Sequence, residues 1–468
     1  MVNNVDIESI VKSVIANMSN TGTTQESSNS SYGIFENMED AINASIKTQR
    51  KVRQLPLEFR EKIIANIRKK TIQNAETMAE MGVKETGMGR VGDKILKHKL
   101  VAEKTPGTED IKTVAWSGDR GLTLVEQGPF GVIGAITPST NSSETVICNT
   151  IGMLSGGNTV VFNPHPGAIG VSNYAVELVN KASVEVGGPN YIACSVKKPT
   201  LQSADTMFKH NSIGLLVATG GPGVVTAVLS SGKRAIGAGA GNPPVVVDET
   251  ADIKKAAYDI FNGATFDNNL PCIAEKEVVV VEEVADELIY YMEEAGSYKI
   301  EGDEIDRLTN TVLIDKNGKT VLNRKYVGKD ARYILDAIGI TVDENIKCII
   351  FEADENHPLV IEELMMPILG IVRVSDVDKA IDLAVELEHG NRHSAHMHSK
   401  NVDNLTKYGK LIDTAIFVKN APSYAALGFG GEGYCTFTIA SRTGEGLTSA
   451  SSFTKIRRCV MAESLCIR

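Results

Sequence analysis

A short apolar run, a polar or glycine-rich turn and a helical stretch follow one another several times between residues 131 and 260. Such alternation implies parallel strands joined by crossover helices, because each strand needs a long connection to return the chain to the same edge of the sheet. The pattern predicts a Rossmann-type, dinucleotide-binding α/β sheet. The expected strands are Gly131–Thr137, Thr159–Asn163, Tyr191–Val196 and Ile213–Thr219, with helices from about Thr145 and at about Val171–Ser183.

A second α/β pattern runs from Cys272 to about Gly433. Its expected strands are Glu277–Val281, Cys348–Phe351, Ile371–Val374 and Ala415–Val418. The chain has 468 residues, which is too long for one simple core, so more than one domain is expected. We expect a dinucleotide-binding domain from residues 33–110 and 131–242, largely helical between 34 and 104, and a catalytic domain from residues 243–433.

Residues 111–130 differ from their surroundings. Residues 111–128 read as two strands around a Gly-Asp-Arg-Gly turn, and the tail from Tyr434 is rich in Gly, Ser and Thr. A hairpin that projects from an α/β body often mediates oligomerisation. We therefore expect 111–130 and 434–468 to be oligomerisation elements of a homodimer or homotetramer, with a plain edge pair of strands as the alternative.

The first residues form a separate unit. Apolar side chains at 7, 10, 11, 14, 15 and 18 make a one-sided helical stripe, and residues 19–32 are a Ser/Thr/Asn-rich linker. A short amphipathic helix (1–18) on a flexible tether is typical of a docking element. The alternative is that this helix packs on its own domain.

Composition excludes several functional classes. A net charge of −10 without a Lys/Arg run argues against nucleic-acid binding. No apolar run approaches the roughly 18 residues of a membrane span, and the start has no secretory signal pattern. The seven cysteines are scattered and odd in number, which favours a reducing, cytoplasm-like compartment.

Cys272 stands in the stretch "NNLPCIAEKE" (268–277), between a polar turn and an apolar run. Asn and Pro resist helix and favour a tight turn there, and a cysteine held in such a turn could face a cleft, where a thiolate is a strong nucleophile. Buried structural cysteine is the commoner case, so the stretch alone leaves both interpretations open. Four other cysteines are expected to be packing residues: Cys148, Cys194, Cys348 and Cys435.

Two glycine-rich turns compete for the role of phosphate loop. "ATGGPGVV" (218–225) lies between a strand and a helix, where Gly220, Gly221 and Gly223 would let the backbone approach an anion. "GAGAGNPP" (237–244) is followed at once by two prolines that forbid a helix in register. We interpret the first as the phosphate turn, although it lacks the full dinucleotide motif and an ordinary tight turn is the alternative. The second is interpreted as a wall of the active site.

Asn141, in "TPSTNSSE" (137–144), follows the first strand of the series. Its amide could donate to a developing oxyanion, and a helix cap is the alternative. The histidines of "NRHSAHMHS", His393, His396 and His398, invite a metal interpretation. No cysteine or acidic residue stands at ligand spacing, so no metal site is expected.

Together these motifs resemble the aldehyde dehydrogenase superfamily, and specifically its CoA-acylating branch, which includes propionaldehyde and butyraldehyde dehydrogenases. The resemblance covers nearly all of residues 32–468. It implies a Rossmann-type cofactor domain, an α/β catalytic domain and an oligomerisation hairpin with a tail. It rests on "ITPSTN", "VVFNPHP", "TGGPG", "AIGAGAGNPPVVVD", "NNLPCIAEKE", "ELMMPI", "FTIASRTGEG" and the late "RRC".

The resemblance also assigns roles to residues. The nucleophile falls on Cys272, and the oxyanion donor falls on Asn141, with the backbone N–H of Cys272 as a second donor. The carboxylate for the nicotinamide ribose falls on Glu363. The implied cofactor-binding set is Thr137, Pro138, Asn163, His165, Thr219, Gly220, Gly221, Gly223, Gly239, Glu363 and Pro367, with the adenosine end along Asn163, Pro164 and His165.

One difference from the hydrolytic members concerns the second step. Their water-activating glutamate falls on Gly237, counting back from Asn242 and Pro243. Glycine offers no base, so water should attack an acyl-enzyme slowly, whereas a thiol needs less help because part of it is already ionised. The resemblance therefore implies reversible oxidation of a short-chain aldehyde, of the propanal or butanal type, to acyl-CoA.

The expected cofactor is NAD, with coenzyme A as co-substrate. NADP use stays open, because Asn163 replaces the family's ribose-binding lysine and no acid stands in this turn to reject a 2′-phosphate. Relatives inside bacterial microcompartments carry a tethered helix like 1–18 that docks to shell proteins, which implies such a location. The alternative is a freely cytoplasmic enzyme of solvent-forming metabolism. Two alternatives are a hydrolytic aldehyde dehydrogenase and a non-catalytic assembly protein. Arg442, where relatives usually have a small residue or Pro, has no assigned role.

Overall fold

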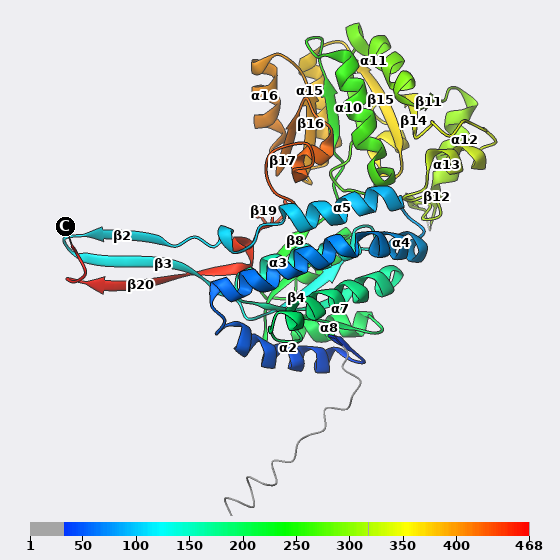
Figure 1. Cartoon of the computed structure of the whole chain (residues 1–468). Helices are drawn as coiled ribbons and strands as arrows, with labels where there is room; N and C mark the ends of the chain where they lie inside the picture. The colour runs from blue at the N-terminus through cyan, green and yellow to red at the C-terminus, as the bar shows by residue number, and fades with distance from the viewer. Residues whose placement is uncertain (1–31, 317, 468) are drawn as a thin grey trace, which may run out of the picture.

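The computed structural model describes residues 32–316 and 318–467. The expected helix at 1–18 and nearly all of the expected linker lie outside the described residues. Two α/β lobes are stacked on one another, and a long thin arm projects from the first lobe (Figure 1). Helix α5 (Val91–Lys104) lies between the lobes.

The first lobe is built on a sheet of six parallel strands in the order β1-β6-β5-β4-β7-β8. From β4 the chain moves outward through β5 and β6 on one side and through β7 and β8 on the other. The carboxyl ends of β4 and β7 therefore flank the point where the strand order reverses, which is where such sheets bind ligands. The strands are β1 (Ile34–Phe35), β4 (Val132–Thr137), β5 (Thr159–Pro164), β6 (Ala193–Val196), β7 (Ile213–Thr219) and β8 (Ala235–Ala238).

Helices cover both faces of this sheet, as its continuously apolar strands require. On one face α2 (Met38–Val52), α8 (Leu201–Lys209) and α9 (Pro222–Leu229) enclose a core. On the other face α5 joins four helices around a larger core: α3 (Leu57–Gln73), α4 (Ala75–Thr86), α6 (Ser142–Ser155) and α7 (Ile169–Glu185).

The second lobe contains seven parallel strands in the order β11-β14-β15-β10-β9-β16-β17. The central strand, β10, is the one that follows Cys272. The strands are β9 (Pro244–Val247), β10 (Glu277–Val281), β11 (Ser297–Lys299), β14 (Cys348–Glu352), β15 (Ile368–Val374), β16 (Ser394–His398) and β17 (Ile416–Lys419).

Helices also cover this second sheet. Helices α10 (Ile253–Thr265) and α11 (Glu282–Ala295) pack on one face, and α15 (Val377–Leu387) and α16 (Val402–Ile412) on the other. A third core holds the smaller elements: α12 (Asp303–Val312), α13 (Ala331–Ala337), α14 (Pro358–Ile361) and the ribbon of β12 (Leu313–Asp315) with β13 (Thr320–Leu322).

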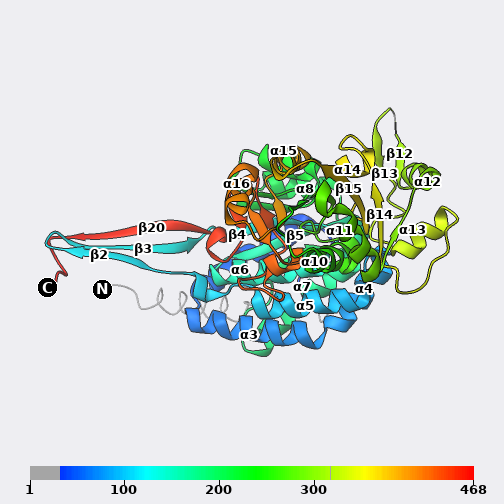
Figure 2. The same ribbon diagram turned by 90° about the horizontal axis from the view of Figure 1, so that it is seen from above.

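The arm is an antiparallel sheet of three strands, β2 (Val114–Gly118), β3 (Gly121–Pro129) and β20 (Thr454–Ala462), with the C-terminus at its tip (Figures 1 and 2). Residues 434–453, with the ribbon of β18 (Ile439–Ala440) and β19 (Gly446–Leu447), pack instead into the first lobe, where Cys435, Phe437 and Phe453 are buried. Of the expected tail element, only β20 pairs with the hairpin.

The structure confirms the alternation predicted from sequence and differs in detail. Ile213–Thr219 and Glu277–Val281 are strands with the predicted bounds. Ile34 and Phe35, expected in a helical region, form strand β1 because they pair with β6. The expected helix from Thr145 begins at Ser142. Within residues 32–316 and 318–467, none of the helices is long and apolar enough to cross a membrane.

Candidate active site

The predicted site residues lie where the edges of the two sheets meet. Pro138 and Asn141 follow β4, and Gly220 follows β7, at the carboxyl edge of the first sheet. In the second lobe the site residues precede neighbouring parallel strands, and the amino ends of such strands share one edge. These are Asn242 before β9, Cys272 before β10, Glu363 before β15 and His393 before β16.

Left-handed backbone shapes the approach to Cys272. Asp267, Asn268 and Asn269 have φ values of 48°, 55° and 65°, a conformation that Asn and Asp tolerate better than other side chains. The Asn268 amide donates to Gly328 O at 3.0 Å, and the Asn269 amide donates to two carbonyl oxygens, each at 2.9 Å. These side chains hold the tight turn that the sequence predicts.

Cys272 is half-buried, whereas Cys148, Cys194, Cys348 and Cys435 are buried, as expected for packing residues. Burial and the nearby Glu363 carboxylate raise the pKa of the Cys272 thiol to about 12. Lys276 and Lys97 lower it in part. The thiol is therefore protonated in this state, and these two lysines are the cations that favour its thiolate.

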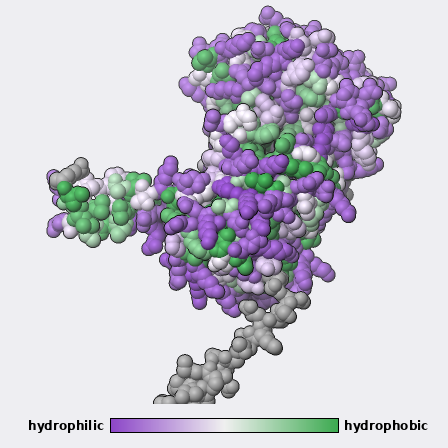
Figure 3. Space-filling view, viewed as in Figure 1, coloured by the Kyte–Doolittle hydropathy of each residue, from purple (hydrophilic) through white to green (hydrophobic). Residues whose placement is uncertain are grey.

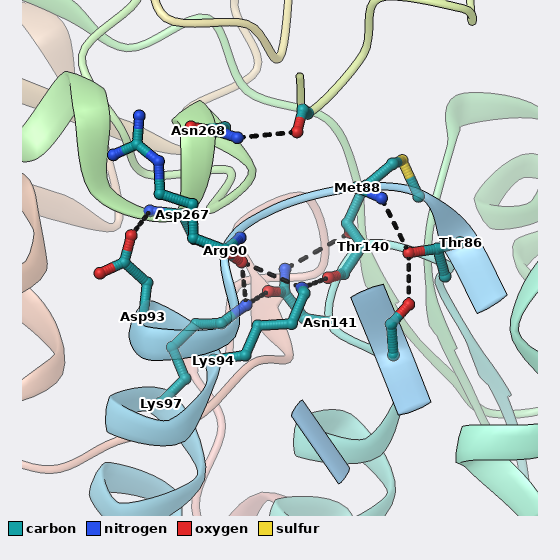
Figure 4. Close-up of polar contacts among 12 residues, drawn as sticks. Thr86, Met88, Arg90, Asp93, Lys94, Lys97, Thr140, Asn141, Asp267 and Asn268 are labelled. Atoms are coloured by element: carbon teal, nitrogen blue, oxygen red, sulfur yellow. Dashed lines mark hydrogen bonds and ion pairs between the residues drawn. The ribbon is translucent and has the colours of Figure 1, made fainter. Parts of the chain in front are cut away.

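Asn141 occupies the N-cap position of α6, but its side chain makes no capping hydrogen bond. Its Oδ1 instead accepts a hydrogen bond from Lys97 Nζ at 2.6 Å (Figure 4). The helix-cap alternative is thus wrong for the side chain. The NH2 group is left to face another partner, as an oxyanion donor requires.

Lys97 belongs to a buried ion cluster that also contains Lys94, Glu144 and Asp267 (Figure 4 draws all but Glu144). Its Nζ lies 2.6 Å from Asp267 Oδ2 and 3.1 Å from Glu144 Oε1. Burial lowers the pKa of Lys97, but the two carboxylates outweigh it and the pKa is raised. Removing one partner of a buried pair typically costs about 3–5 kcal/mol, so this cluster holds its members firmly.

Lys276 is a second buried lysine that sequence reasoning did not single out. Its Nζ donates to the Asn269 backbone oxygen at 3.1 Å and also to the Asn269 side chain. Burial lowers the pKa of Lys276, and the Glu363 carboxylate opposes this. The available signal was a lysine placed directly before a strand that is apolar at every position but its first. Lys97 gave no comparable signal, because its helix contains several other lysines.

Gly237 lies in β8, opposite Ala218 of β7. A Cβ atom at this position would come within 2.8 Å of Val225 Cγ1 on α9, which is closer than real contacts allow. The Gly237 N–H donates to Thr443 Oγ1 at 3.2 Å. Position 237 therefore carries no basic side chain. A basic side chain introduced there would require α9 to move.

The turn Thr219–Gly223 fits a bound pyrophosphate. A Cβ added at Gly220, Gly221 or Gly223 would meet nothing within 4 Å, and none of the three has a positive φ. Neither packing nor backbone strain explains these glycines, whereas close approach of a ligand does. Gly221 caps the N-terminus of α9, and Thr219 Oγ1 is fixed by Thr438 Oγ1 at 2.8 Å.

The other expected cofactor residues near the cleft lie at the two sheet edges that meet there, Thr137 and Gly239 in the first lobe and Glu363 and Pro367 in the second. Thr137 is buried at the end of β4, and its Oγ1 has no hydrogen-bond partner among the described residues. Gly239 follows β8, and a Cβ added there would meet nothing within 4 Å. Glu363 is half-buried, with a pKa raised by burial, and Pro367 is buried just before β15.

The adenosine end is expected along Asn163 and His165. Asn163 is buried, and its Oδ1 accepts a hydrogen bond from Ser203 Oγ at 2.5 Å. Ser203 in turn lines a hollow of about 360 Å³ that also contains Lys198 and Thr200. His165 is exposed and lies just beyond β5. Asn163 therefore reaches this hollow only through its hydrogen bond with Ser203.

His393, His396 and His398 are buried at or within β16. Among the residues that the structure describes, no group of three or more His, Cys, Asp or Glu side chains is arranged to hold a metal ion. A Cβ on Gly241 would lie 2.8 Å from His393 Cγ and 3.1 Å from the Cys272 carbonyl oxygen, so His393 belongs to the wall beside Cys272. Burial lowers the pKa of His393 to about 4.

Arg442 is exposed.

Comparison with known proteins agrees with this geometry. The model of the aldehyde dehydrogenase family matches residues 12–456. The chain is 45% identical to acetaldehyde dehydrogenase (acetylating) EutE of Salmonella typhimurium over 99% of both chains.

Two solved structures are similar over most of their length. One is a propionaldehyde dehydrogenase from the Clostridium phytofermentans fucose utilisation bacterial microcompartment, with 69% identity, a TM-score of 0.92 and coverage of 93% of this chain and 100% of that one. The other is Rhodopseudomonas palustris propionaldehyde dehydrogenase with bound CoA and an acylated cysteine, with 54% identity, a TM-score of 0.91 and coverage of 94% and 100%. With these matches, two parallel sheets and a cysteine between them, the chain belongs to the aldehyde dehydrogenase family.

Proposed function

We propose that this protein oxidises short-chain aliphatic aldehydes to acyl-CoA with NAD, reversibly, through an acyl-thioester on Cys272. The observation that carries the proposal is the combination of a half-buried Cys272 with position 237, where a base is absent and Val225 leaves no room for one. The similarity to acetylating and CoA-binding relatives supports the same reaction.

The first step is attack of the Cys272 thiolate on the aldehyde carbonyl carbon. The thiol loses its proton to solvent, and Lys276 and Lys97 favour the thiolate that remains. The carbonyl oxygen becomes an oxyanion, which the Asn141 NH2 group and the Cys272 N–H stabilise. A bound nicotinamide would supply the hydride acceptor for the former carbonyl carbon, and loss of that hydride would leave a thioester on Cys272.

The second step is transfer of the acyl group from Cys272 to the sulfur of CoA. The CoA thiolate attacks the thioester carbon, the Asn141 amide again stabilises the oxyanion, and the Cys272 sulfur leaves. One thioester replaces another, so the exchange is nearly neutral and both directions are accessible. Water competes poorly, because no side chain at position 237 can take its proton.

The cofactor contacts in this proposal are those expected from the sequence. The turn Thr219–Gly223 would hold the pyrophosphate, and Glu363 would hold the nicotinamide ribose. Thr137, Pro138, Gly239 and Pro367 line the cleft around them. NAD is the proposed cofactor, and no acid projects from the turn Asn163–His165 to exclude NADP.

The decisive experiment measures NADH formation from ethanal, propanal and butanal, with and without CoA, and identifies the products. Turnover that requires CoA and yields acyl-CoA supports the proposal. Equal turnover without CoA, with carboxylate as product, would support a hydrolytic enzyme. A protein with no turnover of any aldehyde in either direction would point to an assembly role.

The arm provides a surface for self-association. Trp116 is 55% exposed and Ile456 is 79% exposed, and Val114 and Val460 are also exposed on the same sheet. The space-filling view shows apolar residues along the arm, in contrast to the mostly polar body (Figure 3). A thin sheet that exposes such side chains is stabilised by a second copy, so we propose a homo-oligomer built through the arm. Multi-angle light scattering of Trp116→Glu together with Ile456→Glu tests it, and an unchanged mass contradicts it.

We also propose that the protein works inside a bacterial microcompartment, with residues 1–18 as the element that docks to a shell protein. The amphipathic stripe in the sequence and the microcompartment source of the Clostridium phytofermentans relative support this location. Deletion of residues 1–18 should leave turnover intact and abolish co-purification with shell proteins. Co-purification that survives the deletion would exclude this role.

A further inference from the structure

The ammonium group of Lys97 contacts three oxygen atoms inside the protein. Its Nζ donates a hydrogen bond to Asn141 Oδ1 at 2.6 Å and forms ion pairs with Asp267 Oδ2 at 2.6 Å and Glu144 Oε1 at 3.1 Å. The side chain is 1% exposed, so water does not replace any of these partners. One cation on α5 thus connects the side chain that follows β4 with the segment that leads to Cys272 (Figure 4).

This contact fixes which end of the Asn141 amide faces the cleft. An ammonium group only donates hydrogen bonds, so it can bind the amide oxygen and cannot bind the amide NH2. With the oxygen held by Lys97, the NH2 group of the planar amide points away from the cluster. The NH2 group lies 3.4 Å from Thr140 Oγ1, a weak contact that leaves the donor available.

Without Lys97 the amide could turn over. The carbonyl oxygen would then face the cleft and repel the oxyanion that forms on the substrate. Asp267 and Glu144 hold the ammonium in place, and Asp267 is itself fixed by Arg90 N–H, which donates to Asp267 Oδ1 at 2.8 Å. The orientation of the amide is therefore imposed by several buried contacts.

We propose that Lys97 is a positioning residue that acts through Asn141 and keeps the amide NH2 toward the oxygen of the reacting carbonyl. The inference rests on the proposed function, which uses Asn141 as the oxyanion donor. Lys97 does not touch the substrate. Because the same ammonium binds Asp267, it also sets the donor and the cysteine-bearing loop relative to one common group.

Lys94 provides a matched control within the same cluster. It lies one helical turn before Lys97 on α5, is also buried, and pairs with Asp267 at 3.1 Å. Its other hydrogen bond is to the Thr140 backbone oxygen at 3.1 Å, so within the described part of the chain its ammonium does not bind the Asn141 amide. Lys94→Met removes a buried cation without freeing the amide.

The test compares Lys97→Met, Lys94→Met, Asn141→Ala and the double variant Lys97→Met/Asn141→Ala in the CoA-dependent propanal assay. We expect Asn141→Ala to lower kcat about 100-fold, as loss of an oxyanion donor does. Lys97→Met should lower kcat about 10- to 100-fold with a nearly unchanged KM, because the oxyanion forms only after binding. In the Asn141→Ala background, Lys97→Met should add less than about twofold. Lys94→Met should lower kcat much less than Lys97→Met.

Three results would overturn the inference. Equal losses from Lys97→Met with and without Asn141 would mean that Lys97 acts elsewhere, for example on the pH profile of the Cys272 thiol. Equal losses from Lys94→Met and Lys97→Met would assign the effect to buried charge alone. A charge-balanced Lys97→Met/Glu144→Gln protein, which serves if the single variant does not fold, would exclude the role if it kept full kcat.

Failure of the proposed function looks different in the same data. Unchanged kcat in Asn141→Ala would remove Asn141 as the oxyanion donor, whatever Lys97 does. Turnover that is independent of CoA would remove the acyl-transfer step and leave the Lys97 comparison readable in the oxidation step.

Discussion

The cluster around Lys97 and the turn Thr219–Gly223 belong to the same site and are built in opposite ways. The cluster consists of buried charged side chains that bind one another, with Lys94, Glu144 and Asp267 as members. The turn contains three glycines with open space around them. Packing against other residues does not require glycine at these positions. Both stand at the carboxyl edge of the first sheet or against it.

The difference follows from what each part has to do. An oxyanion donor must keep one orientation while charge develops, and buried ion pairs supply that rigidity. A pyrophosphate needs backbone N–H groups at close range, and any side chain would block them. Substitutions in the cluster and in the loop to Cys272 should therefore change rate or stability, whereas substitutions in the turn should change cofactor binding.

The largest effect is expected at Cys272, which follows the loop that the charged cluster holds. Cys272→Ser replaces the nucleophilic sulfur by a hydroxyl group that is far harder to ionise, so we expect kcat to fall by about 10³-fold or more. Stopped-flow measurement of NADH formation, with intact-protein mass spectrometry to detect the acyl-enzyme, tests it. A normal burst of NADH in the variant, or an acyl-enzyme that accumulates to wild-type levels, would contradict the assignment of the nucleophile.

The next effect concerns the stability of the fold. Glu275 is an acid near Cys272, and it has no cationic partner among the described ion pairs. Burial raises the pKa of Glu275 to about 7. Because its folded pKa lies above its unfolded value, its contribution to stability is complete below about pH 4.5 and is lost as pH rises through about 7. Glu275→Gln should remove about 2–3 kcal/mol of this pH dependence in the free energy of unfolding.

Urea unfolding of wild type and Glu275→Gln at pH 5 and pH 8 measures that difference. The exposed Glu432→Gln serves as a control and should follow wild type. Parallel curves for wild type and Glu275→Gln would show that Glu275 does not titrate in this window.

A smaller effect, on binding, is expected in the glycine turn. Gly220→Val should raise KM for NAD about tenfold while leaving the melting temperature unchanged, because its Cβ meets nothing within 4 Å in the protein and the residue does not cap α9. Gly237→Val is the matched control, since its Cβ would meet Val225 at 2.8 Å and should lower stability instead. A loss of stability in Gly220→Val with an unchanged KM would mean that the turn is glycine-rich for structural reasons.

The smallest effect tests the electrostatic interaction between Glu363 and Cys272. Burial and the Glu363 carboxylate raise the pKa of Cys272, so Glu363→Gln should lower that pKa and increase the alkylation rate at pH 8 by about threefold. Peptide mapping after iodoacetamide treatment is needed, because Cys459 is exposed and also reacts. A slower reaction of Cys272 in the variant would show that Glu363 favours the thiolate.

Much of the fold could be predicted from sequence, because strand and helix periods are local properties. The strand Glu277–Val281 is apolar at all positions but the first and is recognisable without any partner. Strand β16, "SAHMH", has no apolar run to distinguish it in the sequence, and its burial between β9 and β17 depends on distant neighbours. Strand β20 is exposed and partly basic, and only its pairing with β3 makes it a strand.

Residue types and their order along the chain predicted the chemical groups that we propose for the site. These are the thiol of Cys272, the amide of Asn141, the bare turn at Gly220–Gly223 and the missing base at Gly237. The partners of these groups could be found only in the folded molecule.

Tertiary contacts alone established that Lys97 holds the Asn141 amide, that Lys276 is buried behind the cysteine loop, and that Val225 closes the space at position 237. The reason is physical. Buried ion pairs and steric exclusion arise between segments far apart in sequence, and a lysine on a helix looks the same in the sequence whether it faces water or an amide.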